Sequence, residues 1–67
     1  MKKGKIVSFY DYGTIIDLTV QTKKDIVSIP VAHRMFANFI QDEADNNPRK
    51  LVGKTIWWDD KKEIIFV

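Results

Sequence analysis

The chain has 67 residues, 45% of them hydrophobic, no cysteine, and a formal net charge of +2 from eleven basic and nine acidic side chains. A chain this short forms one domain with one core, and without cysteine it has neither disulfides nor thiolate metal sites. Its net charge is far below that of a dedicated nucleic-acid binder, and its apolar runs are too short to span a membrane. We expect a single domain over residues 1–67, without membrane contact, in the reducing cytoplasm.

The first third of the chain has the pattern of a β-hairpin. Residues 6–10 are rich in β-forming side chains and precede the sequence DYG (residues 11–13). Gly13 can adopt the positive φ of a tight turn. Residues 14–21 then alternate, with polar residues between the apolar side chains of Ile16, Leu18 and Val20. This alternation predicts a half-buried strand.

A third strand and a helix are expected next. Residues 22–25 form a polar turn, and residues 26–29 have strand character. Pro30 is expected to end this strand, because proline cannot donate to a ladder and often occupies a first helical turn.

The period of the apolar residues then changes to that of a helix. Five of them fall at i, i+3, i+4, i+7 and i+8: Ala32, Met35, Phe36, Phe39 and Ile40. This stripe predicts an amphipathic helix, with Ser28 as a possible cap. The breaker cluster at residues 46–48 predicts its end near Asp45.

The chain closes with two further predicted strands, residues 51–58 and 63–67, on either side of a polar turn. Gly53 is a candidate bulge or bend in the first of them. The resulting order, β-β-β-α-β-β, is an α+β arrangement, mainly β with one helix. It is the layout of the OB-fold, and we predict a small five-stranded barrel of that kind with the helix plugging its open end. The alternative is an SH3-like barrel with an inserted helix.

Three segments resemble the cold-shock domain. KGKIVSFYDYGTIID (residues 3–17) resembles its first two strands, with Gly4, Lys5, Ile6 and Phe9 in matching places. DIVSIPVAHRMFANFI (residues 25–40) is similar to the segment that holds its D-V-F-V-H motif, and LVGKTIWW (residues 51–58) to its fourth strand. The resemblance implies an OB-type barrel that binds single-stranded nucleic acid.

The chain departs from that family at the residues that stack on bases. Ser8 stands where the family has tryptophan, and Val27 and Ile29 replace the phenylalanine and histidine of its third strand. Asp17 and Thr19 on the second strand would repel phosphate and offer little stacking surface. The resemblance therefore supports the fold, whereas these departures weaken the case for the family's function.

The candidate binding residues lie at the two loops that flank the ligand face of an OB-fold. Aromatic rings stack on bases and lysines contact phosphates, so aromatics beside lysines suit a single strand. The candidates are Tyr10, Tyr12, Trp57, Trp58, Lys61, Lys62 and Lys5. Consecutive strand residues point to opposite faces, so one of the two tryptophans is expected in the core. The alternative is that the tyrosines only cover the barrel mouth.

No catalytic or metal-binding set is expected. His33 is the only histidine, and Asp59 and Asp60 suit a solvated turn. No phosphate-loop, dinucleotide or nucleophile motif occurs. We therefore expect a non-enzymatic module without a cofactor that binds single-stranded RNA or DNA. The alternative is a protein-interaction or self-associating module that uses an exposed tryptophan, an open strand edge or the acidic helix end at Asp42, Glu43 and Asp45.

Overall fold

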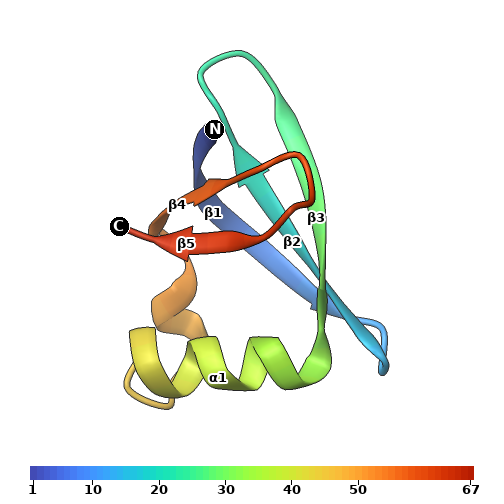
Figure 1. Ribbon diagram of the computed structural model, residues 1–67. Coiled ribbons are helices and arrows are strands. Elements are labelled where there is room, and N and C mark those ends of the chain that lie inside the picture. The colour runs from blue at the N-terminus through green and yellow to red at the C-terminus, as the bar shows by residue number, and fades with distance from the viewer.

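A computed structural model describes all 67 residues, as five antiparallel strands in one sheet and one α-helix (Figure 1). The elements are β1 (Lys2–Asp11), β2 (Ile15–Gln21), β3 (Ile26–Ala32), α1 (His33–Glu43), the 3₁₀ helix η1 (Pro48–Leu51), β4 (Thr55–Trp58) and β5 (Ile64–Phe66). The predicted order β-β-β-α-β-β is confirmed. In space the strands follow the order β3-β2-β1-β4-β5.

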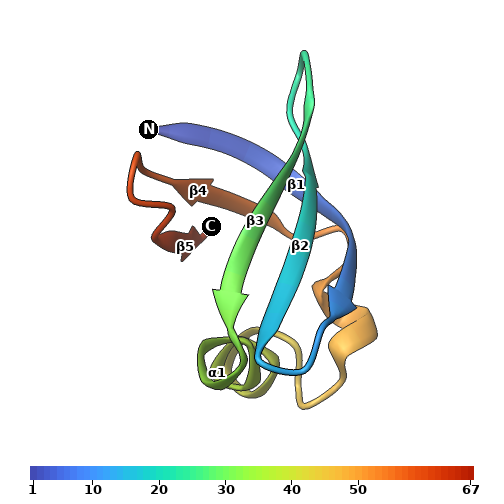
Figure 2. The same cartoon turned by 90° about the vertical axis from the view of Figure 1, so that its right-hand side faces the viewer.

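The long strand β1 belongs to both halves of the sheet. Its first four residues pair with β4, and the stretch from Lys5 to Asp11 pairs with β2. The register against β2 shifts between Ile6 and Ser8, as in a β-bulge. A bulge bends its strand and increases the twist, and Figure 2 shows β1 curving from the N terminus to the β1–β2 loop. The sheet therefore curls around its inner face.

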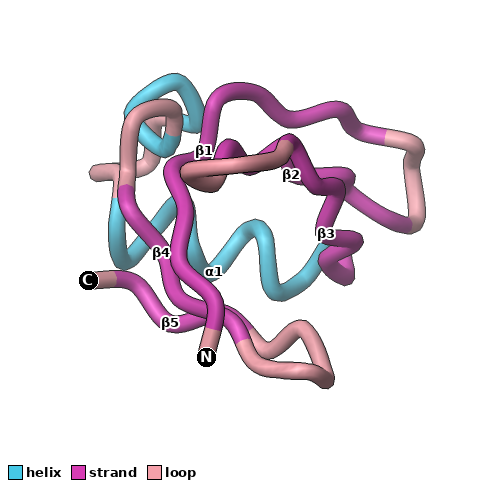
Figure 3. The backbone as a smooth tube through the Cα atoms, turned by 90° about the horizontal axis from the view of Figure 1, so that it is seen from above, coloured by secondary structure: helices cyan, strands magenta, loops and turns pink.

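The curled sheet stops short of a closed barrel. The hydrogen-bonded order begins at β3 and ends at β5, and no ladder joins these two strands. Seen from above, the strands surround the core with α1 beneath them (Figure 3). The structure thus confirms the five antiparallel strands and the single helix, whereas the predicted hydrogen-bonded closure is absent.

The inner face carries the core. Alternation along β2 is confirmed, because Ile16, Leu18 and Val20 are all buried. The other buried side chains are Ile6, Ile29, Val31, Phe36, Ala44, Leu51, Ile56 and Trp58. Taken together, the buried side chains come from every element except β5, whose Ile64 and Phe66 pack against this core cluster. One continuous core is what a domain of this size can form.

Helix α1 lies across one end of the sheet. Phe36 is buried and its ring centroid lies 5.2 Å from that of Phe9 on β1. Phe39 lies 5.0 Å from Phe66 on β5. The helix therefore connects the two halves of the sheet, but Met35, predicted to face inward, is 45% exposed. At eleven residues α1 is far too short to cross a membrane, and no other helix is long and apolar enough.

Two predictions about the start of the helix are wrong. Pro30 lies inside β3, opposite Asp17, and does not end the strand. Because β3 is an edge strand, a proline whose nitrogen faces outward removes no ladder bond. Ser28 also lies within β3, so the residue that precedes α1 is Ala32, which makes no side-chain capping bond.

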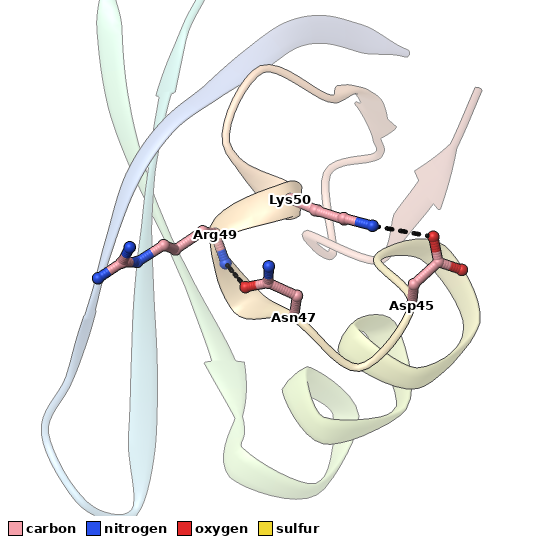
Figure 4. A network of polar contacts seen from close by, with 4 residues as sticks. All are labelled: Asp45, Asn47, Arg49 and Lys50. Atoms are coloured by element: carbon pink, nitrogen blue, oxygen red, sulfur yellow. Dashed lines mark hydrogen bonds and ion pairs between the residues drawn. The ribbon is translucent and has the colours of Figure 1, made fainter.

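The segment after α1 differs from the predicted strand over residues 51–58. Its first part is η1, and the strand begins only at Thr55. The Asn47 side chain accepts a hydrogen bond from the Arg49 amide at 3.1 Å, and Lys50 Nζ lies 3.3 Å from Asp45 Oδ2 (Figure 4). Gly53, with φ of 96°, forms the bend before β4. These local contacts hold η1 so that its last residue, Leu51, is fully buried.

Candidate functional site

A concave surface lies at the end of the sheet away from α1, between the N-terminal part of β1 and the β2–β3 loop; Figure 1 shows these elements. Its volume is about 800 Å³. It is bounded by the first half of β1, by residues 21–25 and by parts of β3 and β4. The charged residues that line it are Lys2, Lys3, Lys5, Lys23, Lys24 and Asp25. We call this surface the basic hollow.

Strand pairing brings these lysines together from two parts of the sequence. Lys5 lies opposite Gln21 at the end of the β1–β2 ladder; before this point β1 pairs with β4, and after it the chain enters the β2–β3 loop, and both segments line the basic hollow. That loop is held by Thr22, whose Oγ1 accepts hydrogen bonds from the amides of Asp25 at 2.8 Å and Lys24 at 3.2 Å. The local bonds fix the turn and leave Lys23 and Lys24 exposed at its tip.

The lysines of the basic hollow form no ion pair. The two ion pairs of the structure, His33 with Asp11 and Lys50 with Asp45, lie elsewhere. The basic hollow holds five lysines and one aspartate, a formal charge of +4. The rest of the chain has six basic and eight acidic residues, a formal charge of −2. The small net charge of the whole chain is therefore the sum of a positive basic hollow and a negative remainder, and composition alone does not show this.

The two tryptophans point to opposite faces of β4, as predicted. Trp58 is only 3% exposed and packs in the core, so it is removed from the candidate stacking residues. Its indole instead contributes to the wall of the basic hollow. Trp57 faces outward and is half-buried, and Lys3 Nζ lies over its ring, 5.2 Å from the centroid. Of the two tryptophans, Trp58 lines the basic hollow, whereas Trp57 lies outside it, next to Lys3, and presents its ring outside the core.

Tyr10 and Tyr12 form an exposed pair at the far end of β1. Their ring centroids are 4.7 Å apart and the side chains are 64% and 67% exposed. Asp11 holds the turn between them: its Oδ1 accepts the Gly13 amide at 2.7 Å and its Oδ2 lies 3.4 Å from His33 Nε2. Tyr10 lies five positions after Lys5 on β1, which is about 17 Å at roughly 3.4 Å per residue. The tyrosines therefore do not line the basic hollow.

Lys61 and Lys62 lie on the β4–β5 loop and do not line the basic hollow either. Asp59 organises this loop, because its Oδ1 accepts the amides of Lys61 and Glu63, both at 3.0 Å. Lys62 has φ of 61°, a left-handed conformation that suits a tight turn. Of the seven predicted residues, the basic hollow includes only Lys5 and Trp58.

The structure contains no group of three or more histidine, aspartate or glutamate side chains placed to hold a metal ion. The basic hollow presents ammonium groups, and one of them, that of Lys3, lies over the Trp57 ring next to the hollow; this combination suits an anion with an attached flat ring. In the comparisons with known proteins, no family model, no curated protein and no solved structure matches this chain.

Proposed function

We propose that this protein is a small, non-enzymatic binding module for single-stranded nucleic acid, with an OB-like fold. The element order and the shared first strand support the fold, and an OB-fold is a partly open five-stranded barrel, which fits the gap between β3 and β5. The observation that carries the function is the set of five lysines around the basic hollow, none of them neutralised by an ion pair.

Phosphate contacts supply most of the affinity in binding of this kind. Each lysine that neutralises a phosphate releases a counterion, so affinity falls with salt at a log–log slope of about −0.7 per contact on single strands. One OB-fold binds roughly 4–16 nucleotides, so an oligonucleotide within that range is long enough to test the contact.

The test is the anisotropy of a labelled, mixed-sequence single strand of about 12 nucleotides. The double variant Lys23→Gln/Lys24→Gln should bind about tenfold more weakly at about 0.15 M salt, with a slope shallower by about 1.4, because two contacts are lost. The matched control is Arg34→Gln/Arg49→Gln, which removes the same charge outside the basic hollow. Equal losses for the two double variants would contradict a localised site.

The second candidate function is protein interaction or self-association. Both margins of the sheet are unpaired, and each carries an exposed isoleucine: Ile26 on β3 is 68% exposed and Ile65 on β5 is 53% exposed. An open apolar edge is a template for pairing with another chain. A sedimentation mass that rises with protein concentration, together with no binding of the oligonucleotide, would favour this function.

A further inference from the structure

We propose that Trp57 is a base-stacking surface beside the basic hollow, and that Lys3 leaves the Trp57 ring for a phosphate when a strand binds. This inference rests on the proposed function. Lys3 pairs with Trp57 across β1 and β4, lines the basic hollow, and holds its ammonium 5.2 Å from the indole centroid. It is therefore shared between the anion site and the aromatic ring.

The other aromatic side chains do not fit this role. Trp58 is buried, and the four phenylalanines lie in the core or pack against it. Tyr10 is about 17 Å along β1 from Lys5, and Tyr12 lies beyond the end of β1. Trp57 alone combines an outward-facing ring with direct contact to a lysine of the basic hollow. Its other cross-strand neighbour, the exposed Ile65, extends the apolar surface beside the ring.

The exchange of partners has a physical basis. An exposed ammonium over an aromatic face is held weakly, whereas a charge-assisted hydrogen bond to phosphate is stronger. A phosphate in the basic hollow would therefore attract Lys3 and uncover the indole. A base attached to that phosphate could then occupy the face that Lys3 leaves. Phosphate binding and base stacking are thus coupled through one side chain.

The coupling predicts different signatures for two variants, measured by anisotropy with the same oligonucleotide. Trp57→Leu removes the stacking surface, so its affinity should fall on the order of tenfold while the salt slope stays that of the wild type. Lys3→Gln removes a phosphate contact, so its slope should be shallower by about 0.7. Tyr12→Leu is the matched aromatic control and should bind as the wild type does. Thermal unfolding of each variant checks that it is folded.

A second readout follows the tryptophans directly. In Trp57→Phe the sole indole is that of Trp58, which is buried at the wall of the basic hollow, so the oligonucleotide should quench the emission much less than in the wild type, although the phenyl ring still permits some stacking. The inference would be overturned if Trp57→Leu bound the oligonucleotide with wild-type affinity and salt dependence, or if quenching in Trp57→Phe were undiminished. Either result would still be compatible with the proposed binding function. If the wild-type protein does not bind the oligonucleotide, the proposed function and the inference both fail.

Discussion

Gly4 lies where β1 passes close to β2 and to Trp58, and its replacement by alanine tests how the curl of β1 is maintained. A Cβ at this position would lie 2.6 Å from Val20 Cγ1, 2.8 Å from the Gln21 carbonyl oxygen and 3.1 Å from Cη2 of Trp58. Val20 and Trp58 are buried. The carbonyl oxygen belongs to the main chain, so no side-chain rotation relieves that contact. The two strands must separate to admit the methyl group.

The expected cost is large for a domain of this size. Overpacking a filled site costs about 1–3 kcal/mol, against a total stability of about 3–5 kcal/mol. At roughly 4–8 °C per kcal/mol, the unfolding midpoint of Gly4→Ala should fall by about 5–20 °C. The assay is thermal unfolding followed by far-UV circular dichroism, with tryptophan emission as a second probe because Trp58 is a contact.

The matched control is Ser8→Ala, an exposed position on the same strand. Its free energy of unfolding should stay within about 0.5 kcal/mol of the wild type, as is usual for surface substitutions. A Gly4→Ala midpoint within about 2 °C of the wild type would refute the argument, because β1 would then not need a side-chain-free residue where it crosses β2.

Four further substitutions test other parts of the structure. Leu51→Ala should cost about 2–5 kcal/mol in urea unfolding, because its fully buried side chain leaves a cavity; a loss below about 1 kcal/mol would mean that η1 does not anchor the core. Asn47→Ala should lower the free energy of unfolding by about 0.5–2 kcal/mol, because η1 loses its cap. Lys50→Ala should lower it by at most about 1 kcal/mol, because the ion pair with Asp45 is exposed. A larger loss for Lys50→Ala than for Asn47→Ala would contradict this account. Asp59→Ala should speed hydrogen exchange of the two amides that its carboxylate binds, and unchanged exchange rates would show that the β4–β5 loop is held by other contacts.

The sequence predicts those elements that have a clean period. The alternation in β2 has period two, so Ile16, Leu18 and Val20 are identified as core without further information. The stripe of α1 has a helical period and correctly identifies Phe36. Pro30 misleads, because its effect depends on whether β3 is an edge strand, and this is a property of the whole sheet.

The basic hollow was missed because its lysines are separated in sequence. Counting back from the turn at Gly13 would have placed Lys5 at the start of the β2–β3 turn, within one residue of its actual partner Gln21. That signal was available in the hairpin pattern. The bulge between Ile6 and Ser8, which shifts the register by one residue, had no such signal. The contact of Lys3 with Trp57 depends on the pairing of β1 with β4, which local patterns do not predict.

The central claim is that the five lysines of the basic hollow bind phosphates of a single strand. The most direct test is the salt dependence of the wild-type affinity for the mixed-sequence oligonucleotide. If all five lysines contact phosphates, the log–log slope should be about −3.5, five times about −0.7. A slope near zero, or no saturable binding at low salt, would contradict the claim.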